Sequence, residues 1–378
     1  MREVLDGVLA GQDVDELELV DLFAARGAEV AAVAEVADEL RRRAVGDEVT
    51  FVVNRSHNYT NVCTFRCTCY GFSKGPLSLN LRGKPYLLTL DDNASRVREA
   101  VAAGATEVCL QGGIHPSFDG SFYLDVARAV RGAAPEVHVH GFTALEVFEG
   151  ARGSGWTSRR TLRMLQEAGL RSLPGTAAAV LDDEVRAVLC PDRVTTDVWL
   201  EVHRTAHAVG LRSNIALMFN LVERPVHWAR HLRTRALQRE TSGFTEFVPL
   251  PFVHMAAPVY LKRGARRGPT WREVVLVHAV PRTGRRSTST CWPASRARPG
   301  VRCASAPRCT AGSRTSRRSC RSRPRGEGSR QPNPKSCGRR ADGPGSQQDV
   351  CCSTTCSDRR SGAGLQLLVA RCARGGRC

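Results

Sequence analysis

The chain has 378 residues, enough for one large or two ordinary domains, and a formal net charge of +18. That charge is not spread evenly, because residues 281–378 hold 22 of the 55 Lys and Arg but only 4 of the 37 Asp and Glu. Residues 1–280 therefore carry 33 residues of each sign and no net charge. A neutral body excludes an extended basic surface there, so nucleic acid is not an expected partner of the body.

The sequence also predicts where the protein works. The N-terminus is acidic and mixed, and no apolar run approaches ~18 residues, so neither a secretory signal nor a membrane span is expected. Residues 1–280 contain five cysteines, three of them in one loop. We expect Cys109 and Cys190 to be core or helix residues rather than a disulfide, which fits a reducing cytoplasm.

Residues 1–47 predict helices, since apolar residues keep a helical spacing that Gly11 interrupts. We expect them to form an N-terminal helical cap over a barrel end. From residue 48 a unit of strand, polar loop, amphipathic helix and Gly or Pro recurs. The expected strands are residues 49–53, 106–110, 136–140, 170–173, 213–219 and 244–248.

The alternation of strands and helices predicts an α/β fold with a parallel sheet. About six regular units predict a TIM-type (βα) barrel over residues 48–280, with its chemistry at the carboxyl ends of the strands. The usual TIM-type barrel has eight strands, so this barrel is expected to be incomplete, lacking its last two.

A cysteine-rich loop follows the first expected strand. Cys63, Cys67 and Cys69 lie within seven residues, in the segment NRSHNYTNVCTFRCTCYGFSKGP. Three such thiolates can hold an iron–sulfur cluster or a zinc ion, or can be adjacent by chance. Structural zinc usually takes two separated pairs of ligands, and no second pair lies nearby. Three thiolates suit a 4Fe-4S cluster with one iron open to another ligand, the chemistry that S-adenosylmethionine (SAM) supports.

Polar residues end several other expected strands. His138 and His140 alternate with valines, so both face one side, where they either reach the barrel axis and substrate or pack against helices. A metal pair is the remaining alternative, although it lacks a carboxylate partner. Thr176 follows Pro174 and Gly175, where backbone N–H groups and a hydroxyl can bind a polar ligand. Glu246 and His254 are further candidates for substrate contact.

Residues 281–378 do not continue the repeating unit of strand, loop and helix. They contain 21 Arg, one Lys and ten Cys, but no Phe, Tyr, Ile or Met. Such a segment cannot bury enough apolar surface to offset its ordering entropy. Binding of RNA through Arg and a disulfide or metal module are alternatives, but the segment has no His and no repeated C-x2-C. We expect a disordered tail, translated out of frame from about residue 280.

The motifs taken together resemble a known family. The stretches YTNVCTFRC, TEVCLQGGIHP, HVHGFTALEV, GLRSLPGTAAAVLDDEVR and GFTEFVPLPFVHMAAPVYL resemble the CofH-type half of FO synthase, a radical SAM enzyme of coenzyme F-420 biosynthesis. The resemblance covers about residues 1–280. It implies a cytoplasmic transferase with a 4Fe-4S cluster and SAM as cofactors. The implied substrates are tyrosine and 5-amino-6-(D-ribitylamino)uracil, and the implied partners are an electron donor and the CofG-type half.

In that family a reduced cluster cleaves SAM, and the resulting radical breaks the Cα–Cβ bond of tyrosine, whose hydroxybenzyl fragment joins the uracil. The resemblance implies that Gln111, Gly112 and Gly113 contact SAM, with a plain tight turn as the alternative. Glu223, after the fifth strand, is expected to bind the ribose or amino group of SAM, or else to be a surface residue. The substrate candidates are His138, His140 and Thr176, and the metal ligands are Cys63, Cys67 and Cys69.

One position departs from the family. The family pattern is C-x3-C-x2-C with an aromatic residue before the third cysteine, whereas this chain has Cys69 followed by Tyr70. The third-ligand position is therefore Tyr70, with Cys69 as its substitute, and we expect the cluster of this copy to be labile or incomplete. Alternative interpretations are a menaquinone-pathway cyclase or aminofutalosine synthase, and an inactive remnant with a basic nucleic-acid-binding tail.

Overall fold

The computed structural model describes residues 1–47, 51–81, 83–284 and 366–369. Most of the predicted tail, and residues 49 and 50 of the first predicted strand, lie outside these ranges. Among the described residues, every helix is too short or too polar to cross a membrane.

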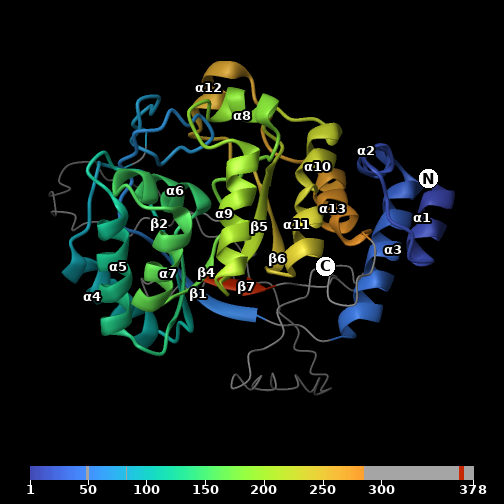
Figure 1. Ribbon diagram of the computed structural model, residues 1–378. Helices are drawn as coiled ribbons and strands as arrows, with labels where there is room; N and C mark the ends of the chain where they lie inside the picture. Colours follow the sequence, from blue (N-terminus) through green and yellow to red (C-terminus); the bar gives the residue numbers. More distant parts are fainter. Residues whose placement is uncertain (48–50, 82, 285–365, 370–378) are drawn as a thin grey trace, which may run out of the picture. The chain divides into compact units, whose positions relative to one another are not determined.

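The core of the fold is a sheet in which six strands run parallel in chain order (Figure 1). The strands are β1 (Phe51–Asn58), β2 (Glu107–Gln111), β3 (His138–Gly141), β4 (Leu170–Leu173), β5 (Arg212–Phe219) and β6 (Phe244–Pro251). Each predicted strand is present, and the sheet curls into a partial TIM-type barrel. In the described residues β6 has a neighbouring strand on one side only, which confirms an incomplete barrel.

The largest error in the predicted strands concerns β1. Its polar stretch from Asn54 to Asn58 was expected to begin the loop, yet it pairs in register with β2. Successive side chains of a strand face opposite sides, and both sides of β1 accept polar residues. His57 bonds Asn93 of helix α4 (Leu90–Ala102) at 2.6 Å, whereas Asn54 bonds Glu107 of β2 on the other face.

The outer edge of β1, which loss of the last two strands would leave open, is also paired. A short strand, β7 (Gln366–Val369), runs antiparallel to it and pairs with residues Phe51 to Asn54. Backbone pairing at this edge satisfies N–H and C=O groups that an open strand leaves exposed. The edge is therefore protected at β1 and open at β6 within the described residues.

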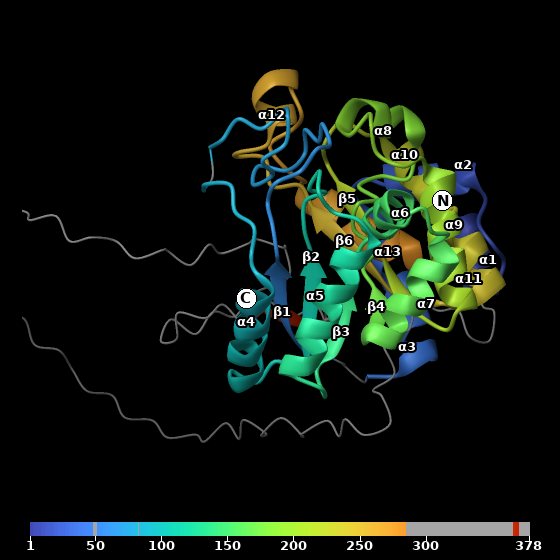
Figure 2. The same ribbon diagram turned by 60° about the vertical axis from the view of Figure 1, so that its left-hand side comes forward.

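Helices follow each strand and cover the outer face of the sheet (Figure 2). The helices after the first three strands are α4 (Leu90–Ala102), α5 (Gly120–Ala133), α6 (Ala144–Gly153) and α7 (Ser158–Ala168). The later ones are α8 (Asp183–Leu189), α9 (Thr196–Ala208), α10 (Pro225–His231), α11 (Thr234–Thr241), α12 (Pro258–Arg263) and α13 (Trp271–Ala279). Capping boxes at Thr89, Thr143 and Thr270 fix the starts of α4, α6 and α13.

The N-terminal helices are α1 (Arg2–Leu9), α2 (Glu16–Ala24) and α3 (Ala28–Val45). Their existence was predicted, but not their position. They pack beside α10 and α13 on the outside of the last units rather than over a barrel end. Apolar contact explains this, since Phe23 meets Trp228 of α10 with ring centres 5.4 Å apart. Arg272 also donates to the Phe23 and Ala25 carbonyls.

The body continues beyond residue 280. A 3-10 turn, η1 (Val280–Arg282), packs against α2 and α3, and both Pro281 and Thr283 are buried. The Arg235 guanidinium donates to the Val280 carbonyl at 3.0 Å and to that of Pro281 at 3.2 Å. The expectation that residues from 281 onward contribute nothing to the core is therefore wrong for residues 281–284.

Candidate active site

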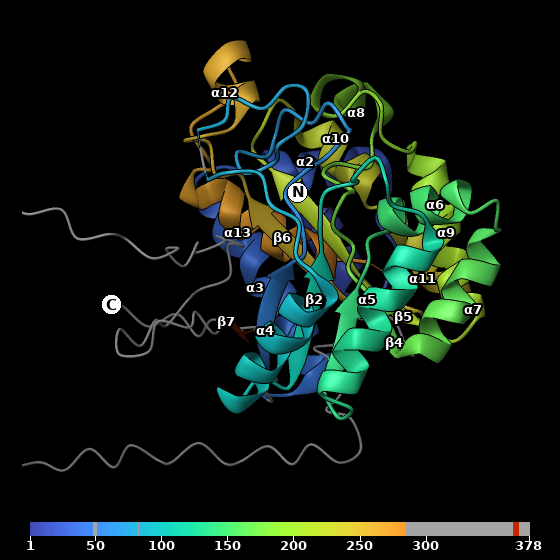
Figure 3. The ribbon, with the colours of Figure 1, turned by 90° about the vertical axis from the view of Figure 1, so that its left-hand side faces the viewer.

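The cysteine loop, residues 59–89, connects β1 to α4 at the carboxyl ends of the strands. Figure 3 shows it on the same end as α8 and α12. The Thr68 amide and hydroxyl both donate to the Leu189 carbonyl at the end of α8, at 2.9 and 3.0 Å. The Thr68 carbonyl accepts from the Val259 amide of α12 at 2.9 Å. Two later helices thus hold the middle of the loop.

A second clamp holds the residue before Cys67. The Arg66 amide donates to both carboxylate oxygens of Asp192, at 3.1 and 2.9 Å. Thr64, next to Cys63, donates through its amide to the Ile114 carbonyl at 2.8 Å. Backbone contacts therefore fix the cysteine loop on both sides of Cys67.

The three loop cysteines are buried free thiols, and so is Cys190 after α8. Burial raises the pKa of Cys67 to about 11, while nearby Arg193 acts in the opposite direction. Burial likewise raises the pKa of Cys69, against the same arginine. Three sequestered thiols on a backbone-fixed loop beside a cation fit a thiolate-ligated cluster. As predicted, Cys109 and Cys190 form no disulfide.

Tyr70 stands at the position where the sequence predicts the third cluster ligand. The Arg193 guanidinium lies over its ring, with 5.2 Å between the guanidinium carbon and the ring centre. Burial raises the pKa of the Tyr70 phenol, so this group is protonated near neutral pH and is a poor metal ligand. Cys63, Cys67 and Cys69 are therefore the thiol donors that this loop offers, and their role as cluster ligands stays a prediction.

Gly112 and Gly113 end β2 directly under the loop. A Cβ at Gly112 would lie 2.3 Å from the Tyr59 ring, and one at Gly113 would lie 2.0 Å from the Val62 carbonyl oxygen. Neither glycine has a positive φ, so a tight turn is not the reason for them. They let the cysteine loop lie directly against the end of β2.

A buried carboxylate, which the sequence analysis missed, supports this strand end. Glu146 accepts hydrogen bonds from the Gly112 amide at 3.0 Å, the Thr143 amide at 2.6 Å and the Tyr59 hydroxyl. Burial raises its pKa, although these donors act against that shift. The signal in the sequence was the capping box from Thr143 to Glu146.

Two of the predicted substrate residues, His138 and His140, belong to a row of polar side chains in contact inside the sheet. The row, called the interior row below, comprises Asn54, Glu107, His138, Ser172, His140, Asn214 and Glu246, and it crosses all six parallel strands. Asn54 and His57 lie three residues apart and so face opposite sides, and His57 faces α4. The interior row therefore lies away from the helices, and the helix-packing alternative for His138 and His140 is wrong.

Ser172 bonds Nε2 of His138 at 2.6 Å and Nδ1 of His140 at 2.7 Å. Glu107 also approaches Nε2 of His138, at 3.7 Å. A serine nucleophile would need its acid on the other ring nitrogen, so these residues do not form a hydrolytic triad. Next to the interior row, the Thr176 hydroxyl donates to Gln111 Oε1 at 2.6 Å, which joins a predicted substrate residue to a predicted SAM residue.

Glu223 is buried, so the alternative of a surface glutamate is wrong. Its carboxylate accepts from the Asn220 amide, from the Leu221 amide at 2.8 Å and from the Trp228 indole at 3.0 Å. These bonds hold the loop after β5 against α10. Contact with SAM remains a prediction for this residue. Its neighbours His227, Trp228 and His231 are all buried.

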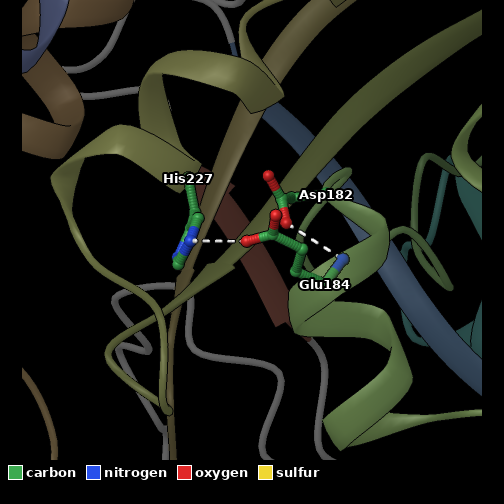
Figure 4. Close-up of side chains that lie close together, drawn as sticks. All are labelled: Asp182, Glu184 and His227. Carbon is green, nitrogen blue, oxygen red and sulfur yellow. Dashed lines mark hydrogen bonds and ion pairs between the residues drawn. The ribbon is translucent and has the colours of Figure 1, made fainter.

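One group outside the loop has the residue types of a metal site: Asp182, Glu184 and His227 (Figure 4). His227 Nε2 lies 3.9 Å from Glu184. However, His227 Nδ1 accepts from the Arg224 amide, which leaves the proton of a neutral imidazole on Nε2. Arg230 already lies 3.1 Å from Asp182 and also contacts Glu16. The group joins α2, α8 and α10 rather than offering ligands.

Comparison with known proteins identifies the family. A model of the radical SAM superfamily matches residues 57–231. The chain is 42% identical over 285 residues to the 5-amino-6-(D-ribitylamino)uracil–L-tyrosine 4-hydroxyphenyl transferase of Methanoculleus marisnigri, covering 75% of this chain and 76% of that one. The chain belongs to this CofH-type family of radical SAM proteins.

Other relatives of this CofH-type chain are longer. It is 46% identical over 266 residues to the FO synthase of Streptomyces coelicolor and 47% identical over 266 residues to that of Mycobacterium tuberculosis H37Rv. These matches cover 70% of the chain but only 30% and 31% of those FO synthases.

Solved structures show the same fold. Methylornithine synthase PylB aligns with a TM-score of 0.56 at 14% identity, covering 75% of this chain and 77% of that one. The hydrogenase maturase HydG aligns with a TM-score of 0.59 at 13% identity, covering 78% and 61%.

Proposed function

We propose that this chain is a radical SAM transferase that joins the 4-hydroxybenzyl group of tyrosine to 5-amino-6-(D-ribitylamino)uracil, a step in the biosynthesis of the deazaflavin FO of coenzyme F-420. The observation that carries the proposal is the similarity to the Methanoculleus transferase over 75% of the chain. The fixed loop of three buried cysteines at the carboxyl ends of the strands supports it.

Cys63, Cys67 and Cys69 would hold a 4Fe-4S cluster. When bound, the cluster and SAM supply the electron and the organic radical that the reaction needs. The protein contributes position: Thr68 and Arg66 anchor the loop to residues 189–192, and Gly112 and Gly113 bring β2 against it. We propose Gln111, Gly112, Gly113 and Glu223 as SAM contacts.

His138, His140 and Thr176 are proposed to contact substrate. His138 and His140 lie in β3 and face the inside of the sheet, Thr176 follows β4, and their hydrogen-bond partners fix their orientations. Fixed polar groups that need not reorganise are suited to hold a reacting molecule in one geometry.

A complete pathway needs further proteins. We propose a CofG-type half as the partner that closes the deazaflavin, and a separate electron donor, with both working in the cytoplasm. The FO synthases of which this chain spans about 30% of the length are consistent with a second half. The comparisons lend no support to a menaquinone-pathway cyclase. A defective copy remains part of the proposal, because Tyr70 stands in the third-ligand position.

The test is anaerobic reconstitution of the full chain with iron and sulfide, followed by incubation with reductant, SAM, tyrosine and the aminouracil. The proposal expects 5′-deoxyadenosine and a product whose mass equals that of the aminouracil with one hydrogen replaced by the 4-hydroxybenzyl group. The variant with Cys69→Phe and Tyr70→Cys is run beside it. SAM cleavage by that variant without the coupled product would contradict the proposed substrates.

A further inference from the structure

The interior row ends on β6 at Glu246, a carboxylate that can accept further hydrogen bonds. Glu246 accepts one hydrogen bond, from Asn214 Nδ2 to Oε1 at 3.1 Å. Within residues 1–47, 51–81, 83–284 and 366–369, its second oxygen has no hydrogen-bond partner. Glu246 is half-buried, so this oxygen can meet a small molecule inside the sheet.

Asn214 is held in one orientation. Its Oδ1 accepts from the Gly175 amide at 2.5 Å, and an amide N–H can only donate. The nitrogen Nδ2 therefore points to the other side, where it donates to Glu246 and to Nε2 of His140 at 3.3 Å. Because Nε2 of His140 accepts, its proton is on Nδ1 and is donated to Ser172 at 2.7 Å.

The charge of the interior row discriminates between the two proposed substrates. It contains two carboxylates, Glu107 and Glu246, and no Lys or Arg. Tyrosine is a zwitterion whose α-carboxylate is best bound by a cation, and the interior row contains no Lys or Arg. A ribitylaminouracil carries no carboxylate, and its hydroxyl and ring N–H groups are donors that a carboxylate accepts.

We propose that Glu246 is the specificity-determining contact for the polyol-bearing pyrimidine, accepting hydrogen bonds from its hydroxyl or N–H groups, and that Asn214 positions this carboxylate. The inference rests on the proposed function and deepens it, since it assigns the sheet interior near β5 and β6 to one of the two substrates. Asn214 acts through Glu246 and is a positioning residue.

The experiment measures binding to the full chain without cluster, under anaerobic conditions, by calorimetry with 5-amino-6-(D-ribitylamino)uracil and separately with tyrosine. Glu246→Gln is expected to weaken binding of the aminouracil roughly tenfold or more, because a hydrogen bond to a charged acceptor becomes a neutral one. Tyrosine binding is expected to stay the same. Asn214→Ala is expected to show the same selectivity with a smaller loss.

Glu246→Asp keeps the acceptor and is expected to recover most of the affinity, which separates loss of a contact from misfolding. Thr245→Ser, on the neighbouring position of β6, is the matched control and is expected to change neither affinity. If Glu246→Gln weakens binding of both ligands equally, or weakens binding of neither, the assignment is overturned while the proposed function stands. A natural chain that binds tyrosine but no aminouracil would overturn both.

Discussion

The guanidinium carbon of Arg193 lies 5.2 Å from the centre of the ring of Tyr70, the residue at the predicted third-ligand position. A cation over an aromatic face is stabilising by about 0.5–2 kcal/mol, more where water is excluded. The pair therefore helps to hold the cysteine loop closed in this chain. It also places a positive charge beside Cys67 and Cys69.

Replacing Arg193 is expected to loosen the loop. In Arg193→Ala the cation–π contact is lost, and backbone amides of residues 64–70 should exchange hydrogen roughly tenfold faster, as expected for a loss of about 1–2 kcal/mol. Arg193→Lys should give an intermediate rate. Arg66→Ala, which removes only the half-exposed ion pair with Asp192, is the control. Equal exchange in all three variants would show that the pair does not hold the loop.

Glu146 is expected to contribute more to the free energy of unfolding than a helix-capping residue usually does. Glu146→Ala leaves the Tyr59 hydroxyl and the Gly112 and Thr143 amides without their acceptor in a buried site, which costs about 2–4 kcal/mol. Asp92→Ala removes the matching capping box of exposed helix α4 and should cost about 1 kcal/mol. Urea unfolding of both variants measures the difference, and equal losses would contradict a role for burial.

Acid should destabilise the protein through its buried histidines. Burial lowers the pKa of His57 and His140 to about 4 and that of His231 to about 3. Unfolded histidines titrate near 6.5, so below this pH the unfolded state binds more protons and stability falls as the pH drops towards 4. At pH 5 each buried histidine costs up to roughly 2 kcal/mol.

The measurement is the urea midpoint at pH 7 and pH 5. It should fall clearly in the natural chain and fall less in His57→Gln, whose side-chain amide can still donate to Asn93. A midpoint that is the same at both pH values would mean that these histidines are not buried as described.

Two truncations test where the body ends. A chain that stops at residue 284 keeps η1 and the Arg235 contacts, whereas one that stops at residue 280 loses buried Pro281 and Thr283. We expect the shorter chain to be less stable by about 1–3 kcal/mol, visible as a lower melting temperature. If the two truncated chains have the same melting temperature, residues 281–284 do not belong to the core.

Much of the fold could be predicted, because the spacing of apolar residues and the Gly and Pro residues between elements are local signals in the sequence. The segment 170–173 was placed without error, since its flanking Gly169 and Pro174 mark both ends. The end of β1 was missed because polar residues line both faces of that strand, so Asn54 to Asn58 lack the apolar alternation of a buried strand.

The site was predictable only where residues that act together are close in sequence. The three cysteines share one loop, and His138 and His140 share one strand. By contrast, Arg193 is more than 120 residues from Tyr70, and Asn214 is 74 residues from its partner His140. Only the tertiary fold brings such residues together, and no local sequence pattern indicates that they are in contact.

The cluster of the proposed transferase is tested most directly by exchanging the two residues at its third-ligand position. The natural chain and the variant with Cys69→Phe and Tyr70→Cys are reconstituted anaerobically, and bound iron and the rate of SAM cleavage are measured. We predict that the natural chain holds less iron and cleaves SAM at least tenfold more slowly, because its last thiol is displaced along the loop by about 3 Å, the span of one extended residue. Equal iron content and equal cleavage in the two proteins would contradict this account of the loop.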